Sequence, residues 1–282
     1  MGSLSKITAQ IRLPLNIKVP SYLMDHQFQG NAVLPAVEAM EILAATTVAH
    51  LPSTPIHSIH NAVFNKFLVI EKGANEIEAF NDLEVLDDGT VVSRFITRTR
   101  SEKAKITRTK DHAVLHFKNF PKNPTSSIPQ LHETPGYHVS TETIYSTLVP
   151  FGPSYHNLKG VNLFEKGALG TVHAPRRAGL PIPLGSPFPL DAAFHVACVW
   201  GQRYAGLVGF PVGFGLRRVL RKICAGKTCA VEVFPKAVYA NRFLVDIWIR
   251  GMDGVLQEVV WDVEMKDVTG GRIKPPSWIV KV

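Results

Sequence analysis

Hydrophobic and polar residues alternate along much of the chain, as they do in strands that bury one face. The alternation is clearest in five segments, residues 76–80, 94–98, 228–234, 243–249 and 255–265. Only two segments have the composition of helices. Residues 35–50 are rich in Ala, Glu, Met and Leu after a proline suited to a first helical turn, and residues 190–207 follow a proline-rich break. The pattern predicts a strand-rich chain with two long helices.

A proline-rich stretch, residues 121–136, has no hydrophobic period and reads as a linker. It separates residues 1–120 from residues 137–282, and each part contains one long helix and several strands. We therefore expect two domains, each an α+β unit of strands around one helix.

Composition narrows the class of protein. Of the 282 residues 45% are hydrophobic and 19% are charged, which is typical of a globular protein with a sizeable core. No apolar run approaches the ~18 residues that span a bilayer, and the first residues lack the apolar segment of a signal peptide. We expect a cytoplasmic protein. The three cysteines, Cys198, Cys224 and Cys229, have no CxxC spacing, which favours buried thiols over a disulfide framework or a zinc site.

Two common classes of enzyme are not indicated. Residues 213–218 lack the final glycine of a dinucleotide-binding loop, and no GxSxG nucleophile motif occurs. The net charge of +8 suits an acidic partner, although surplus lysine more often makes a solvated surface.

Two short motifs carry the candidate chemistry. His26, Gly30 and Pro35 form the pattern HxxxGxxxxP, and Asp191 and His195 form DxxxH. A histidine that takes a proton and a carboxyl group that gives one are what a dehydration across neighbouring carbons requires. Each motif lies at a predicted helix, one in each half of the chain.

The resemblance to a known family rests on these motifs and on two further segments. Residues 150–155 resemble a YGPxF motif, and residues 210–214 resemble an LPVGF strand. In this order the four landmarks are similar to those of the dehydratase domains of polyketide and fatty-acid synthases. The resemblance covers most of the chain. It implies an α+β double hotdog fold, in which two antiparallel sheets each wrap around a long helix and pack as a pseudo-dimer.

The resemblance also implies a free-standing dehydratase of β-hydroxyacyl thioesters. In that reaction His26 removes the α-proton as base, and protonated Asp191 gives a proton to the β-hydroxyl, so that a trans-α,β-enoyl thioester results. His195 matches the residue that hydrogen-bonds to the carboxyl group or to the departing hydroxyl. The substrate arrives on the phosphopantetheine of an acyl carrier protein, with no metal and no other cofactor. We expect no nucleic-acid or membrane partner, a monomer or homodimer, and a polyketide or fatty-acid synthase as the wider context.

Supporting roles are expected around the base. Gly30 permits a tight turn, and Pro35 begins the helix. The backbone N–H groups of Leu34 and Ala36 would then polarise the thioester carbonyl, although the family usually has glycine where Ala36 stands.

The segment with Phe151, Gly152 and Pro153 is expected to form one wall of a substrate tunnel, with phenylalanine where the family commonly has tyrosine. Tyr155 either lines the same wall or is an ordinary core aromatic.

A basic run after the LPVGF-like strand is a candidate carrier-docking patch, with Arg217, Arg218 and Arg221 as its main cations. The alternative is a strand end with solvated arginines.

Other interpretations remain open at this stage. The same acid/base pair would serve a product-template-like cyclase, and a hotdog thioesterase or a silent acyl-binding partner would share the fold. A metal site at His26, Asp191 and His195 is conceivable but lacks HExxH-type spacing. His112 and His116 alternate along a strand and are expected to face solvent at a sheet edge, while residues 57–60 are expected to form a loop.

Overall fold

The computed structural model describes residues 5–101, 106–120, 136–176 and 179–281. The predicted linker, residues 121–136, falls almost wholly outside the described residues. The predicted domain boundaries at its two ends therefore remain predictions.

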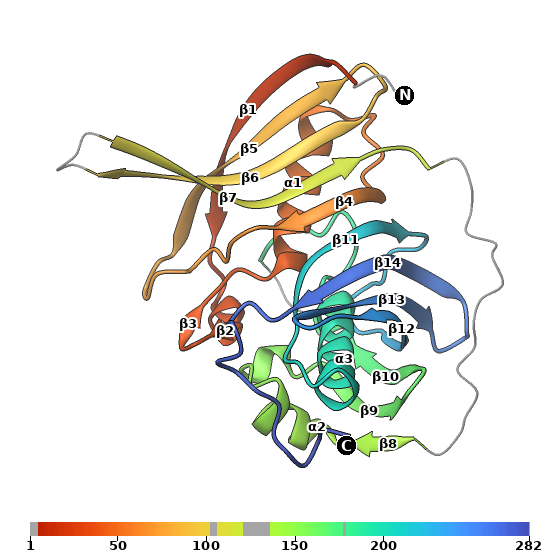
Figure 1. The fold of residues 1–282 in the computed structure, drawn as a ribbon. Coiled ribbons are helices and arrows are strands. Elements are labelled where there is room, and N and C mark those ends of the chain that lie inside the picture. The colour runs from red at the N-terminus through yellow and green to blue at the C-terminus, as the bar shows by residue number, and fades with distance from the viewer. Residues whose placement is uncertain (1–4, 102–105, 121–135, 177–178, 282) are drawn as a thin grey trace.

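The described strands before this segment curve around one long helix, α1 (Ala36–His50) (Figure 1). They are β1 (Ile7–Lys18), β4 (Ser58–Phe64), β5 (Glu76–Leu86), β6 (Val91–Ser101) and β7 (Ile106–Phe117). A 3-10 turn, η1 (Ser21–Asp25), and a small hairpin of β2 (Gln27–Phe28) and β3 (Asn31–Ala32) connect β1 to the helix.

The later part of the chain repeats this plan around α3 (Phe188–Tyr204). Its strands are β8 (Tyr137–Val139), β9 (Leu158–Phe164), β10 (Gly167–His173), β11 (Phe210–Val219), β12 (Thr228–Val238), β13 (Arg242–Gly251) and β14 (Leu256–Lys266). Short helical turns α2 (Thr141–Thr143), η2 (Ile144–Leu148) and η3 (Pro153–Tyr155) lie between β8 and β9.

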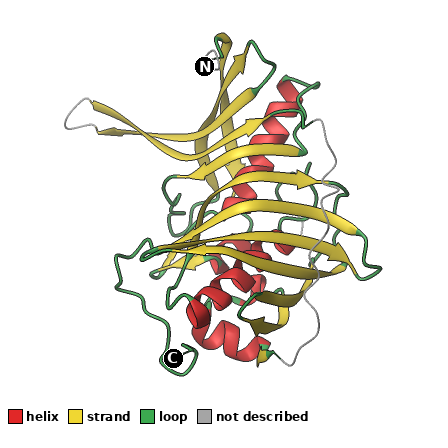
Figure 2. Cartoon of the chain, turned by 45° about the vertical axis from the view of Figure 1, so that its right-hand side comes forward, coloured by secondary structure: helices red, strands yellow, loops and turns green. Residues whose placement is uncertain are grey.

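The two sets of strands form one continuous antiparallel sheet of 12 strands, in the order β1-β5-β6-β7-β4-β11-β14-β13-β12-β10-β9-β8. The join is the β4–β11 pair, in which Ala62 lies opposite Phe214 and His60 opposite Leu216. Figure 2 shows the strands curving around both long helices. The predicted double hotdog arrangement is therefore confirmed, with the two sheets hydrogen-bonded edge to edge.

The long helices are held by burial on several sides. In α3 every residue from Phe188 to Gln202 is buried, and in α1 Met40, Leu43 and Ala44 are almost completely inaccessible to solvent. Burying a large apolar side chain contributes about 1.5–3 kcal/mol. Packing against the sheet, more than intrinsic helix propensity, accounts for these two helices.

Three local expectations were wrong. Residues 58–60 belong to β4, because the chain leaves a turn at residues 56–57 and then pairs with β11. The strand β7 is internal, between β6 and β4, so His112 is buried at 6% exposure instead of facing solvent at an edge. Cys224 is exposed, whereas Cys198 and Cys229 are buried as expected.

In the part of the chain that the structure describes, no helix combines the length and apolar character needed to cross a bilayer.

Candidate functional site

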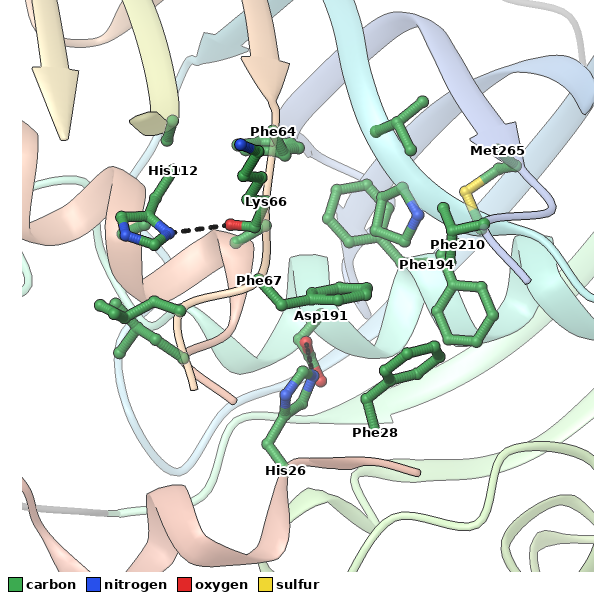
Figure 3. A pocket seen from close by; sticks show the side chains of 18 of the residues that line it. His26, Phe28, Phe64, Lys66, Phe67, His112, Asp191, Phe194, Phe210 and Met265 are labelled. Atoms are coloured by element: carbon green, nitrogen blue, oxygen red, sulfur yellow. Dashed lines mark hydrogen bonds and ion pairs between the residues drawn. The ribbon is translucent and has the colours of Figure 1, made fainter. Parts of the chain in front are cut away.

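His26 and Asp191 approach each other across the junction of the two halves. The Nε2 atom of His26 lies 3.9 Å from Oδ1 of Asp191, and both side chains are largely buried. His26 follows η1, and Asp191 lies in the first turn of α3. Figure 3 shows the two side chains pointing toward one another inside a pocket. The separation is too long for a direct hydrogen bond, but it suits two groups that act on neighbouring atoms of a substrate.

The contacts of His26 leave its outer nitrogen available as a base. Nδ1 lies 3.1 Å from the carbonyl oxygen of Val33. A carbonyl can only accept, so Nδ1 carries the hydrogen and Nε2 presents a lone pair toward Asp191. Burial lowers the pKa of His26, an effect that the nearby Asp191 opposes and His195 adds to. The neutral, proton-accepting form is thus favoured at neutral pH.

A tight hairpin sets the position of His26. Gln29 and Gly30 both have positive φ, at 50° and 79°, which is the signature of a type I′ turn between β2 and β3. The returning strand brings Val33 back to His26, whose carbonyl oxygen accepts the N–H of Val33 at 2.9 Å. Gly30 therefore has the turn role expected of it. Pro35 stands one position earlier than expected, as the extended N-cap residue, and α1 begins at Ala36.

Asp191 and His195 share one face of α3, as their spacing predicts. Nε2 of His195 lies 3.2 Å from Oδ2 of Asp191, and the two residues are 4% and 5% exposed. Nδ1 of His195 contacts the hydroxyl of Tyr145 at 3.3 Å. The sequence motifs did not indicate Tyr145, which lies in the short helical turn η2.

The cavity that contains these groups has a volume of about 490 Å³ and a mostly apolar wall. Its size is that of an ordinary small-molecule site. Four residues of the wall are also exposed to solvent and mark where the cavity opens: Asn65, Lys66, Phe67 at 40% and Val268 at 37%. The aromatic side chains around this opening come from both halves and are Phe28, Phe67 and Phe210.

The expected wall residues divide into two groups. Leu34, Ala36 and Phe151 line the cavity. Gly152, Pro153 and Tyr155 do not belong to the wall that the described residues form, and their expected role as substrate contacts is not supported. They lie behind it, where the Tyr155 ring packs edge-on against His26 with 5.0 Å between ring centroids. The Phe151 ring stacks on the face of His26 with 4.4 Å between ring centroids.

Only one of the two expected carbonyl-polarising N–H groups is available. The N–H of Leu34 already donates to the carbonyl oxygen of Leu68 at 2.9 Å. Among the described residues, the N–H of Ala36 makes no backbone hydrogen bond, as expected for the first residue of a helix. Because Ala36 also lines the cavity, its N–H is the donor placed to polarise a bound carbonyl group.

The expected docking patch is in the wrong place. Arg217 is 2% exposed, and its guanidinium forms a buried ion pair with Glu258 at 2.7 Å. Arg218 packs over the ring of Phe120 at 5.3 Å. The last cavity residue on β11 is Val212, and Arg218 follows six positions (218 − 212) later, about 20 Å along a strand. Arg221 lies beyond the end of that strand. These cations are therefore remote from the opening.

Three polar residues of the cavity wall were not predicted, namely Asn65, Lys66 and His112. Lys66 is exposed and lines the cavity next to Phe67, which makes it a cation at the opening. His112 lies deeper, with Nδ1 donating to the carbonyl oxygen of Lys66 at 3.0 Å and Nε2 bonded to the hydroxyl of Thr97 at 2.8 Å. The alternation along β7 gave the only sequence signal for His112, and nothing distinguished Lys66 from other surface lysines.

The alternative of a metal site has no geometric support. The described residues contain no group of three or more His, Cys, Asp or Glu side chains arranged to hold a metal ion.

Solved structures of other proteins share the fold described above. The dehydratase domain from the CurF module of curacin polyketide synthase aligns with a TM-score of 0.70 and 17% identity, over 94% of this chain and 96% of that domain. An N-terminal dehydratase from the difficidin assembly line aligns with a TM-score of 0.71 and 12% identity, over 93% of this chain and 95% of that one. A trans-AT polyketide synthase dehydratase domain from Brevibacillus brevis aligns with a TM-score of 0.70 and 15% identity, over 93% of this chain and 96% of that domain. No protein-family model and no curated protein sequence matches the chain.

Proposed function

We propose that this chain is a hydro-lyase that removes water from a β-hydroxyacyl thioester and forms a trans-α,β-enoyl thioester. The observation that carries the proposal is the 3.9 Å approach of His26 Nε2 and Asp191 Oδ1 within one apolar cavity. The solved domains with the same fold are named as dehydratases of polyketide synthases, which supports polyketide synthesis as the context. Fatty-acid synthesis would use the same chemistry.

The contacts of the site support a role for each group in the reaction. The neutral Nε2 of His26 takes the α-proton, which is acidified by the adjacent thioester carbonyl. The free N–H of Ala36 stabilises the negative charge that develops on that carbonyl oxygen. Protonated Asp191 then gives its proton to the β-hydroxyl, which leaves as water. The apolar wall excludes bulk water from the carbanion-like intermediate.

Delivery of the substrate follows from the opening of the cavity. An acyl group on the phosphopantetheine arm of an acyl carrier protein can enter past Phe67 while the carrier stays outside. Lys66 supplies positive charge at this opening for an acidic carrier or for the phosphate of its arm. The proposal requires no metal and no cofactor other than that arm.

The test is to incubate the protein with a saturated β-hydroxyacyl carrier-protein thioester and to follow the carrier-bound product by mass spectrometry. Loss of one water from the bound acyl chain, abolished in a His26→Ala control, is the expected result. Release of the free acid would indicate a thioesterase, and binding without any change of mass would indicate a silent partner. Cyclisation of a poly-β-keto chain, without dehydration of the simple substrate, would indicate a product-template-like enzyme. Each of these three results contradicts the proposal.

A further inference from the structure

The hydroxyl group of Tyr145 contacts the acid/base site from behind. Its oxygen accepts the backbone N–H of Leu158 at 3.0 Å and lies 3.3 Å from Nδ1 of His195. The ring is buried and stacks on His156 with 4.2 Å between ring centroids. Tyr145 does not line the cavity wall formed by the described residues, so any effect it has on the reaction passes through His195.

These contacts decide which way the hydrogen bond between Tyr145 and His195 runs. Burial raises the pKa of Tyr145 above its usual range, so the hydroxyl keeps its hydrogen. Leu158 N–H is a donor and cannot receive it. Among the described residues, Nδ1 of His195 is the acceptor within reach, and a buried hydroxyl hydrogen left without an acceptor would be costly. A neutral imidazole that accepts at Nδ1 carries its own hydrogen at Nε2. His195 therefore turns an N–H group, and not a lone pair, toward Asp191.

This tautomer makes the two oxygens of Asp191 unequal. Oδ2 lies 3.2 Å from the Nε2–H of His195, whereas Oδ1 faces Nε2 of His26. The pair lies within 3.2 Å but does not have the angles of a good hydrogen bond, and neither atom has another hydrogen-bond partner among the described residues. A hydrogen on Oδ2 would lie against the N–H of His195, whereas a lone pair there is attracted to it, so the acidic hydrogen of the carboxyl group belongs on Oδ1. A lone pair at Nε2 would instead draw that hydrogen to Oδ2, away from the substrate.

We propose that Tyr145 is a positioning residue that fixes the tautomer of His195 and thereby keeps the transferable proton of Asp191 on Oδ1. The inference rests on the proposed dehydration, in which Asp191 is the acid. In the reaction the Oδ1–H bond breaks, its proton joins the departing β-hydroxyl, and the C–O electron pair leaves with the water. The C–H electron pair left by the α-proton becomes the new double bond. The released water can bridge the 3.9 Å between His26 Nε2 and Oδ1, and transfer of the α-proton through it to Oδ1 restores the starting state.

The tautomer can be measured without any catalysis. In the full-length protein labelled with ¹⁵N-histidine, long-range ¹H–¹⁵N spectra distinguish Nδ1–H from Nε2–H rings, and the signals of His195 are those that vanish in His195→Gln. We expect Nε2–H in the wild type and an Nδ1–H or mixed state in Tyr145→Phe. Tyr22→Phe is the matched control, because it removes another buried tyrosine hydroxyl, the one bonded to Glu38 at 3.0 Å, and should leave His195 unchanged. An Nδ1–H ring at His195 in the wild type would overturn the inference, whether or not Tyr145→Phe folds.

Kinetics separate positioning from simple packing. Tyr145→Phe should lower kcat about tenfold, the scale of one lost hydrogen bond, with little change in KM. In a His195→Gln background the same substitution should have no further effect on kcat, because a glutamine side chain has no tautomers. An equal loss in both backgrounds would mean that Tyr145 acts through packing, and the inference would be wrong. If the wild type does not dehydrate the substrate, the proposed function fails while the spectrum still reports on the tautomer.

Discussion

The carboxylate of Asp25 accepts a hydrogen bond from the backbone N–H of Ser154 at 2.8 Å, although the two residues belong to different halves of the molecule. The carbonyl oxygen of Asp25 also accepts the N–H of Gly152 at 2.7 Å. The two segments approach so closely that a Cβ atom at Gly152 would lie 2.6 Å from Cγ of Asp25. Because His26 follows Asp25 directly, these bonds fix the base relative to the half that carries the acid.

Asp25→Ala should therefore impair catalysis more than folding. Loss of the bond to Ser154 costs about 1 kcal/mol of stability, while the freed loop misplaces His26 and lowers kcat by roughly tenfold. The control is Asp88→Ala, outside the cavity wall, which removes a comparable side-chain bond to the backbone N–H of Thr90 at 3.0 Å and an exposed ion pair with Lys118 at 2.8 Å. Thermal unfolding and steady-state rates should show similar stability losses but a lower kcat only for Asp25→Ala. Equal kcat values for the two variants would contradict this role.

Lys66 tests where the carrier docks. Lys66→Ala should raise KM for a carrier-bound substrate about threefold at low ionic strength and leave turnover of a short pantetheine thioester unchanged, because a rim charge acts mainly on association. Arg218→Ala, at the remote end of β11, is the control and should change neither value. If Arg218→Ala has an effect equal to that of Lys66→Ala, the carrier docks at the arginines and the role of Lys66 is wrong.

Two buried carboxyl groups on α1 predict an unusual dependence of stability on pH. Burial raises the pKa of Glu38 to about 7 and that of Glu41 to about 8, from 4.5. Between the unfolded-state pKa of 4.5 and these raised values, the folded state binds more protons than the unfolded state. The free energy of unfolding should therefore decrease as pH rises from about 5 to 8. The double variant Glu38→Gln/Glu41→Gln should lose this decline. Denaturant unfolding at several pH values gives the free energy of unfolding of the variant and of the wild type. If the two free energies change with pH in parallel, neither group titrates in this window.

The activity should depend on pH through His26. The neutral form is the base, so kcat/KM should rise with pH through the pKa of His26 in the free enzyme. Burial lowers that pKa from the usual 6.5, which places the acid limb of the profile below 6.5. Circular dichroism over the same range checks that the limb is not due to unfolding. A limb centred above 6.5 would show that another group controls the rate.

The features predicted from sequence are those with local signals. The two helices have helical composition and proline starts, and the turn at Gly30 needs positive φ. The pairings of β4 with β7 and with β11 have no local signal, because they join segments far apart in the chain. The β4–β7 pair makes β7 an internal strand, on which His112 is buried.

The error at Arg217 could have been avoided. Side chains alternate along a strand, so Arg217 shares a face with Val219, which is buried, while Arg218 points the other way. The alternation of buried and exposed positions along this strand thus predicts a buried Arg217, although the run of cations by itself suggests a solvated patch. The partner Glu258, on β14, could not be identified without the sheet order.

The most direct test of the acid/base pair is the single-turnover rate of dehydration of a β-hydroxyacyl carrier-protein thioester by wild type, His26→Ala and Asp191→Asn. Each variant should be slower by roughly a hundredfold or more, with unchanged folding, because each lacks one of the two proton transfers. The double variant should be little slower than either single one, since the two groups act as a unit. A near-normal rate in either folded single variant would contradict the central claim that His26 takes the α-proton and Asp191 gives the proton that releases water.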